Sequence, residues 1–222
     1  MKKDYTDIHV IADGSGSMRY LIDDMIGSFN TLIETQKAAP GEATVSFYKF
    51  DDLYEPLYQW VPLTEIKELT NKDYFARGMT ALYDAIGKTI MAMGVKYAAM
   101  AEEDRPESVM LLILTDGQEN SSKEYTQKMI KEMIELQTGT YKWVINFLGT
   151  NQDAVLTARS MGISLDNAMT YTNNSEGLKS AITTMSDKYT MYRSCVGPKD
   201  ATLLNFTAAD AQVQEDAKNS SI

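Results

Sequence analysis

The chain has 222 residues, an apolar fraction of 44% and a charged fraction of 23%, which are typical of one globular domain. Its formal net charge is −10 and its lysines and arginines are scattered, so we expect neither nucleic acid nor an acidic membrane surface as a partner. No stretch approaches the ~20 apolar residues of a membrane-spanning helix, no secretion signal is recognisable, and the single cysteine fits a reducing compartment, so we expect a cytoplasmic protein.

Short apolar runs alternate with helical periodicity, which predicts an α/β fold with a mainly parallel sheet. Strands are predicted, in chain order, over residues 8–12, 44–50, 54–63, 109–115, 143–148 and 168–171. Helices are predicted over residues 19–36, 81–100, 123–137, 153–161 and 175–195, the last with Ser175 as its N-cap. The wholly apolar run at 109–115 indicates a central strand. Pro56 and Pro62 place the run at 54–63 on an edge, where it is expected to pair antiparallel with 44–50.

The sequence contains no internal repeat and no linker long enough to separate two domains. One domain is expected over residues 1–197. Beyond Gly197-Pro198 the sequence becomes polar, and residues 198–222 are expected to form a tail that is partly helical or disordered.

A polar loop at residues 13–17, Asp-Gly-Ser-Gly-Ser, follows the first predicted strand. Its carboxylate and hydroxyls at alternate positions are hard oxygen ligands, which suit a small cation such as Mg²⁺. A second carboxylate, Asp116, follows another apolar strand, and Thr80 supplies a hydroxyl between them. Because ligands bind beyond the carboxyl ends of strands in open α/β sheets, these side chains meet if the two strands are neighbours. The candidate metal ligands are Asp13, Ser15, Ser17, Thr80 and Asp116.

A cation in this site would keep part of its charge. Two carboxylates only partly neutralise the surroundings of a dication, and three hydroxyls add no charge. One coordination position is expected to hold exchangeable water. Such a site attracts an external carboxylate, so the expected partner is a protein that presents an Asp or Glu side chain.

The order Asp-x-Ser-x-Ser, distant Thr, distant Asp resembles the metal-ion-dependent adhesion site (MIDAS) of the von Willebrand factor A (VWA) domain family. The resemblance extends over residues 7–195, and the five candidate ligands fill the pattern. It implies a doubly wound, Rossmann-like sheet, here of six strands with one antiparallel edge strand, and helices on both faces. It also implies Mg²⁺, with Mn²⁺ or Ca²⁺ as substitutes, and a partner whose acidic residue completes the metal shell. Because no signal or anchor is recognisable, the chain is expected to resemble the free-standing intracellular members of bacteria and their phages more than the extracellular members.

Two other functions would use the same residues. A subunit of a homo-oligomer would engage the site of a neighbouring copy, and the sequence does not determine the oligomeric state. A metal-dependent phosphohydrolase would use Asp13 as nucleophile, but residue 15 is Ser instead of a second acid, no P-loop is present, and His9 is expected inside a strand. We therefore expect a binding module, not an enzyme, with no catalytic residue and no organic cofactor.

Residues near the candidate ligands have ordinary interpretations as well. Thr80 alone is able to cap the helix predicted at 81–100. Asp51-Asp52 is expected to form the turn of a hairpin, and Asn120 to stabilise its own loop. Four polar residues are expected to flank the crevice and to influence the choice of partner: Gln118, Glu119, Asn151 and Gln152.

Overall fold

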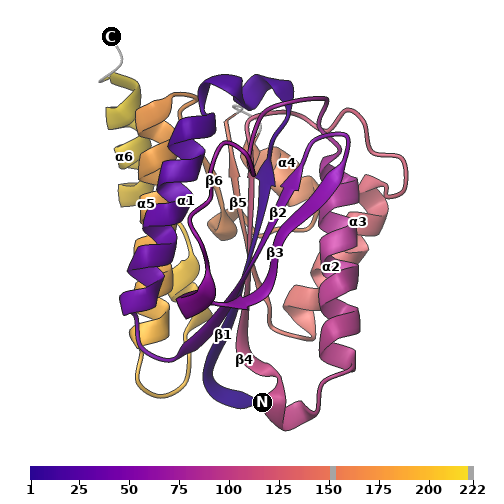
Figure 1. Cartoon of the computed structure of the whole chain (residues 1–222), viewed down its shortest axis with the longest axis vertical. Helices are drawn as coiled ribbons and strands as arrows, with labels where there is room; N and C mark the ends of the chain where they lie inside the picture. The colour runs from indigo at the N-terminus through magenta and orange to yellow at the C-terminus, as the bar shows by residue number, and fades with distance from the viewer. Residues whose placement is uncertain (151–153, 220–222) are drawn as a thin grey trace.

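The computed structural model describes residues 1–150 and 154–219 of the chain. Its strands are β1 (Lys2–Asp13), β2 (Glu42–Phe50), β3 (Tyr54–Pro62), β4 (Pro106–Thr115), β5 (Val144–Gly149) and β6 (Ala168–Thr170). They form one six-stranded sheet in the order β3-β2-β1-β4-β5-β6 (Figure 1). β3 pairs antiparallel with β2, and the other neighbours pair parallel. The predicted α/β fold with one antiparallel edge strand is confirmed.

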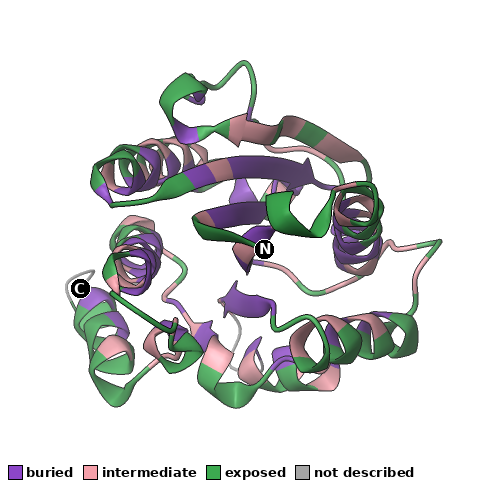
Figure 2. Cartoon of the chain, turned by 90° about the horizontal axis from the view of Figure 1, so that it is seen from below, coloured by how far each residue is buried: buried purple, intermediate pink, exposed green. Residues whose placement is uncertain are grey.

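Helices cover both faces of the sheet (Figures 1 and 2). They are α1 (Ile22–Ala38), α2 (Leu82–Ala98), α3 (Gln127–Gly139), α4 (Ala154–Ser160), α5 (Ser175–Ser194) and α6 (Ala208–Asn219). α1 and α5 pack on one face and α2, α3 and α4 on the other. The doubly wound arrangement that was expected is therefore present. None of the helices in the described part of the chain is long and apolar enough to span a membrane.

The central strands are apolar because both of their faces are covered. In β4, Met110 and Leu112 pack against the layer of α1 and α5, whereas Leu111 and Ile113 pack against the layer of α2 and α3. Successive side chains of a strand point to opposite faces, so a wholly apolar run fills both cores. Figure 2 shows the buried strands between the two helical layers.

His9 lies inside β1 and is fully buried, as predicted for a structural residue. Its Nε2 atom is 3.1 Å from Asp7 Oδ2, and the Tyr97 hydroxyl donates to the same oxygen at 2.7 Å. Burial raises the pKa of Asp7, but the charge and hydrogen bond of His9 and the hydroxyls of Tyr97 and Thr44 bring it below its usual value. The only histidine of the sequence thus belongs to the packing of the sheet.

α1 begins at Ile22, after a 3-10 turn over Gly16–Tyr20, rather than at residue 19. The start of α3 and the N-cap of α5 also differ from those predicted, whereas α5 itself begins at Ser175 as predicted. α3 begins at Gln127 rather than at residue 123, because the amides of residues 123–125 donate to the carboxylate of Asp84. α5 is capped by Asn174 rather than by Ser175, since Asn174 Oδ1 accepts from the amide of Gly177 at 2.7 Å. The differences at α3 and α5 arise from hydrogen bonds that helical periodicity does not record.

The C-terminal segment packs on α5. The Lys188 ammonium of α5 pairs with Asp210 of α6 at 2.9 Å. Gln214 of α6 is buried; its side chain accepts from the amide of Thr172 and donates to the carbonyl of Gly177. Part of the predicted polar tail is therefore a docked helix, and the domain boundary at residue 197 stays a prediction.

Candidate metal site

β1 and β4 lie side by side and run parallel, so they end at the same edge of the sheet. The chain continues from β1 toward β2 and β3 on one side, and from β4 toward β5 and β6 on the other. The end of the β1–β4 pair is thus the point where strand order reverses, which is where open α/β sheets bind ligands. Asp13 is the last residue of β1, and Asp116 directly follows β4.

Ser15 and Ser17 connect the two carboxylates. The amide of Ser15 donates to Asp13 Oδ1 at 2.7 Å, and the Ser17 hydroxyl donates to Asp116 Oδ1 at 2.6 Å. The two serine hydroxyls lie 3.0 Å apart. Four of the five predicted ligands therefore form one hydrogen-bonded cluster.

Thr80 reaches the same place from the loop before α2. Its Oγ1 atom lies 3.0 Å from the position that a Cβ on Gly117 would occupy, and Asp13 Oδ2 lies 3.7 Å from that position. A side chain at residue 117 would therefore enter the space between these oxygens, which explains the glycine after Asp116. The Thr80 hydroxyl has no hydrogen-bond partner among the described residues, so it is free to bind a ligand.

Thr80 does not cap α2, contrary to one of its two interpretations. The amides of Tyr83 and Asp84 instead donate to Glu119 Oε2 at 2.9 Å and to Ser122 Oγ at 3.0 Å. These acceptors come from the loop after β4. They accept hydrogen bonds from the first free amides of α2, so the Thr80 hydroxyl is not needed as a cap and remains available to a ligand of the site.

Backbone contacts hold the three loops of the site together. The amide of Thr80 donates to Asn120 Oδ1 at 2.9 Å, and the amide of Asn120 donates to the Thr80 carbonyl at 3.0 Å. The amide of Gly16 donates to the carbonyl of Gly78 at 3.2 Å. Asn120 thus joins its own loop to the loop of Thr80, a role wider than the one predicted for it.

Both carboxylates are held in a poorly solvated place. The pKa of Asp13 is raised to about 6, mainly by burial; hydrogen bonds from Thr115 and Ser15 offset part of this rise, and the charge of Asp116 adds to it. Burial also raises the pKa of Asp116. Asp116 Oδ2 is buried without a hydrogen-bond partner among the described residues. A cation at this position would stabilise both ionised groups.

Two residues that support Asp13 were not singled out by the sequence analysis. The Thr115 hydroxyl donates to Asp13 Oδ2 at 2.5 Å, and the buried Tyr74 hydroxyl donates to the carbonyl oxygen of Asp13. Thr115 adjoins Asp116, so its position next to a candidate ligand was a usable signal. Tyr74 lies outside every predicted element and carries no comparable signal in the sequence.

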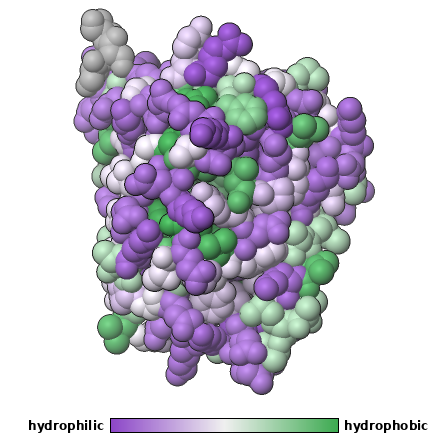
Figure 3. Space-filling view, in the orientation of Figure 1, coloured by the Kyte–Doolittle hydropathy of each residue, from purple (hydrophilic) through white to green (hydrophobic). Residues whose placement is uncertain are grey.

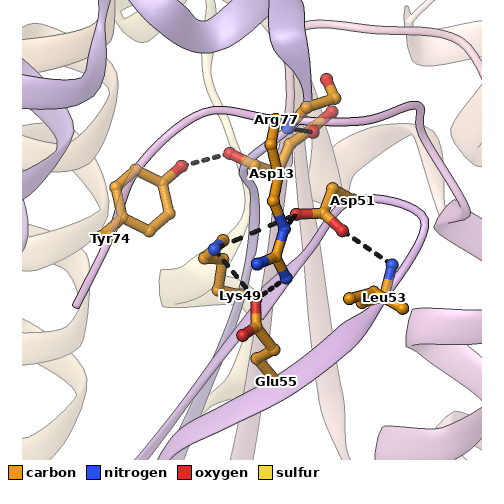
Figure 4. Close-up of polar contacts among 8 residues, drawn as sticks. Asp13, Lys49, Asp51, Leu53, Glu55, Tyr74 and Arg77 are labelled. Atoms are coloured by element: carbon orange, nitrogen blue, oxygen red, sulfur yellow. Dashed lines mark hydrogen bonds and ion pairs between the residues drawn. The ribbon is translucent and has the colours of Figure 1, made fainter. Parts of the chain in front are cut away.

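A cluster of four charged side chains supports the first loop from the side of β2 (Figure 4). Lys49 Nζ lies 2.9 Å from Glu55 Oε2, and Arg77 pairs with both Glu55 and Asp51, reaching Asp51 Oδ2 at 2.8 Å. The carbon chain of Lys49 lies 3.0 Å from where a Cβ on Gly14 would stand, and the amide of Arg77 donates to the Gly14 carbonyl at 2.8 Å. The loop of the site therefore rests on a neutralised ionic cluster.

The Asp51-Asp52 turn joins β2 to β3 as predicted, and it also lies at the rim of the site. The amide of Leu53 donates to Asp51 Oδ1 at 2.7 Å, and the carbonyl of Asp51 accepts from the amide of Ala81 at 2.9 Å. The hairpin turn is thereby fixed next to Thr80.

The donor set consists of oxygen atoms alone. The described residues contain no cluster of three or more Asp, Glu, His or Cys side chains placed to hold a metal ion. The candidate site has two carboxylates and three hydroxyls, a set that suits a hard cation such as Mg²⁺ rather than a soft metal. Of the flanking residues predicted, Gln118 is exposed and Glu119 binds the start of α2. Asn151 and Gln152 lie outside the described residues.

No protein-family model matches the sequence, and no curated protein is significantly similar to it. Solved structures are similar in fold. Proximal thread matrix protein 1 from the mussel byssus is 16% identical with a TM-score of 0.63, over 84% of this chain and 46% of that one. The ArnB paralog VWA2 from Sulfolobus acidocaldarius is 18% identical with a TM-score of 0.52, over 82% and 44%. A von Willebrand factor type A protein from Catenulispora acidiphila is 16% identical with a TM-score of 0.57, over 84% and 43%.

Another structure of the mussel protein has a zinc-occupied MIDAS motif; it is 14% identical with a TM-score of 0.59, over 84% of this chain and 46% of that one. The present chain spans less than half the length of each of these proteins. The similarity shows that the chain has the fold of VWA domains.

Proposed function

We propose that the chain is a metal-dependent protein-binding module. Five residues of this chain would hold Mg²⁺: Asp13, Ser15, Ser17, Thr80 and Asp116. An Asp or Glu side chain of a partner protein would complete the coordination of the ion. The observation that supports this most directly is Asp116 Oδ2, a buried carboxylate oxygen without a hydrogen-bond partner among the described residues. The unpartnered Thr80 hydroxyl on the other side of Gly117 adds to the argument.

The charge of the site supports an anionic ligand. Only two of the five donors are anionic, and hydroxyl oxygens leave much of the field of a dication unbalanced. A carboxylate from outside would be drawn to that field, whereas an amine or guanidinium would be repelled. The zinc-occupied MIDAS motif of the mussel protein shows that a divalent cation is held in a protein of this fold.

A binding role is proposed in preference to catalysis. Residue 15, where a phosphohydrolase would need a second acid, is Ser. His9 is fully buried in the sheet beside Asp7, and Lys49 and Arg77 are paired with carboxylates. His9, Lys49 and Arg77 are thus engaged by other side chains, which favours a binding role over catalysis on a phosphate. We also propose a cytoplasmic location, on the basis of the single cysteine, and a bacterial or phage source, on the basis of the resemblance to free-standing VWA proteins.

Thermal melts with EDTA and with excess Mg²⁺ test the metal site. A cation that binds only the native state adds about 2.7 kcal/mol at a hundredfold excess over its Kd. Because one kcal/mol moves the midpoint of a domain of this size by roughly 2–4 °C, we expect Mg²⁺ to raise Tm by about 5–10 °C. The rise should disappear in Asp116→Ala and persist in Asp187→Ala, which removes an exposed carboxylate of α5. Equal melting of the wild type in Mg²⁺ and in EDTA would refute the proposal.

A further inference from the structure

Four large apolar side chains are exposed on the loops that bound the candidate metal site. They are Tyr20, Leu53, Phe75 and Met79, with exposed fractions of 86%, 55%, 38% and 55%. We call these four residues the apolar rim. Side chains of this size usually lose contact with water when a protein folds, so their grouping around a single site calls for an explanation.

Contacts between the loops place the residues that precede Leu53 and Met79 next to each other. A Cβ on Gly78 would lie 1.7 Å from Asp52 Oδ1, so these two residues touch. Leu53 and Met79 directly follow them in sequence. Gly78 also accepts the hydrogen bond from Gly16, so this part of the rim adjoins the first loop of the site.

Phe75 and Tyr20 extend the rim alongside the first loop of the site, residues 13–17. The Phe75 ring centroid lies 3.6 Å from Lys49 Nζ and 5.2 Å from the guanidinium carbon of Arg77. Lys49 packs beneath Gly14, so the ring stands beside the first loop. Tyr20 ends the 3-10 turn that begins in that loop. Figure 3 shows hydrophobic residues among hydrophilic ones at the upper end of the molecule, where these loops lie.

The opposite side of the site is polar. Gln118, Asn120, Lys123 and Glu124 are exposed on the loop after β4, and none of the described residues of that loop is an exposed large apolar side chain. The described surroundings of the site are therefore asymmetric. A ligand centred on the cation would meet apolar surface on the side of β2 and polar surface on the other.

The charges that favour an acidic ligand are those of the cation and of Arg19, because the rest of the apolar side, with the exposed Asp52, has no net positive charge. Arg19 is exposed next to Tyr20, and its Nε donates to the carbonyl of Gly16 at 3.3 Å. Arg77 is partly exposed beside Phe75 and is balanced by Asp51 and Glu55. With a dication in the site, an acidic segment would find positive charge at the centre and at the edge near Arg19.

We propose that the partner presents its acidic residue directly next to bulky apolar side chains, which pack on the apolar rim while the carboxylate reaches the cation. This inference rests on the proposed function. Coordination of a carboxylate is common to every acidic segment and does not discriminate between them. The burial of apolar flanking residues on the rim provides the discrimination.

Selection from a library of random peptides displayed on phage tests the inference without a known partner. The full chain is immobilised with excess Mg²⁺, and bound phage are eluted with EDTA. We expect the eluted peptides to contain Asp or Glu with Leu, Ile, Phe, Tyr or Trp at adjacent positions. Peptides synthesised from this set should bind the wild type only with Mg²⁺.

Paired double variants then locate the contact. Leu53→Ser with Met79→Ser should weaken binding of the selected peptides by about tenfold, a factor that corresponds to about 1.4 kcal/mol. Met91→Ser with Val95→Ser, which alters exposed residues of α2 farther along the helix, should leave it unchanged. The Mg²⁺-induced rise in Tm should be equal in the wild type and both variants, which shows that the rim variant folds and binds metal.

The outcomes separate this inference from the proposed function. Eluted peptides that share an acidic residue but have random or basic neighbours would overturn the inference and leave the proposed function intact. Apolar peptides that resist EDTA would overturn it too, because the rim would then act apart from the cation. A selection with no EDTA-eluted peptide, together with an absent Mg²⁺ effect on Tm, would overturn both.

Discussion

Burial disfavours the ionised form of both carboxylates of the candidate site, Asp13 and Asp116. Asp13 is fully buried and its pKa is raised to about 6, even though Thr115 and Ser15 donate hydrogen bonds to it. The pKa of Asp116 is raised by burial as well. An acid whose pKa is higher in the folded state destabilises that state when it is ionised. At the residue scale, the site thus lowers stability in the absence of a cation.

The variant Asp13→Asn should therefore stabilise the metal-free protein at neutral pH. The contribution of Asp13 to stability is fully present below 3.8, its unfolded pKa, and is lost as the pH rises through about 6. Removing the charge should recover on the order of 3 kcal/mol above that range and nothing below it. Denaturant unfolding in EDTA across this pH range measures the difference.

The same variant should lose the response to Mg²⁺, which sets its effect apart from a general gain in stability. The matched control is Asp187→Asn, whose carboxylate is exposed. If Asp13→Asn were less stable than the wild type in EDTA at neutral pH, the account of burial given above would be wrong.

At the scale of elements, α2 organises the loop that carries Asp116. The carboxylate of Asp84, in the first turn of α2, accepts from the amides of Lys123, Glu124 and Tyr125 at 2.8–2.9 Å. In return, Glu119 accepts from the amide of Tyr83. Helix and loop thus satisfy each other's backbone donors, and this exchange delays the start of α3.

Replacing Asp84 by Ala should loosen this loop. Three amides lose their acceptor, and we expect a loss of about 1–3 kcal/mol in the free energy of unfolding. Burial raises the pKa of Asp84, but the three amide donors bring it below 3.8. The loss should therefore be present above pH 3.8 and shrink as the pH falls through the lowered pKa.

Hydrogen exchange provides the element-level readout for Asp84→Ala. The amides of residues 123–125 should exchange faster, while those of β5 stay protected. Uniform acceleration across the sheet, or no change at residues 123–125, would contradict the assignment of Asp84 to this loop.

At the scale of the whole molecule, the net charge of −10 bears on self-association. Copies with the same charge repel each other, so a partner other than a second copy is expected. Gel filtration of the full chain should give the same elution volume in Mg²⁺ and in EDTA. A larger species that requires Mg²⁺ and is lost in Asp116→Ala would instead identify a neighbouring copy as the ligand of the site.

Much of the architecture was predictable because strands and helices follow from residue patterns that extend over only a few positions in the sequence. The apolar run of β4 and the prolines of β3 indicated a central and an edge strand, and both assignments are confirmed. The start of α3 and the N-cap of α5 were wrong, because they depend on hydrogen bonds that Asp84 and Asn174 accept from backbone amides. The candidate site was found from the sequence through its polar loop, while its function as a metal site stays a prediction.

By itself the sequence determined the order of strands and helices, and it named the five oxygen donors that follow two apolar strands. Only the tertiary structure decided that β1 and β4 are neighbours, that Glu119 leaves the Thr80 hydroxyl free, and that Lys49 supports Gly14. The physical reason is the range of the forces involved. Hydrophobic periodicity and turn chemistry act over a few residues, whereas strand pairing and the satisfaction of buried donors join residues that are far apart in the chain.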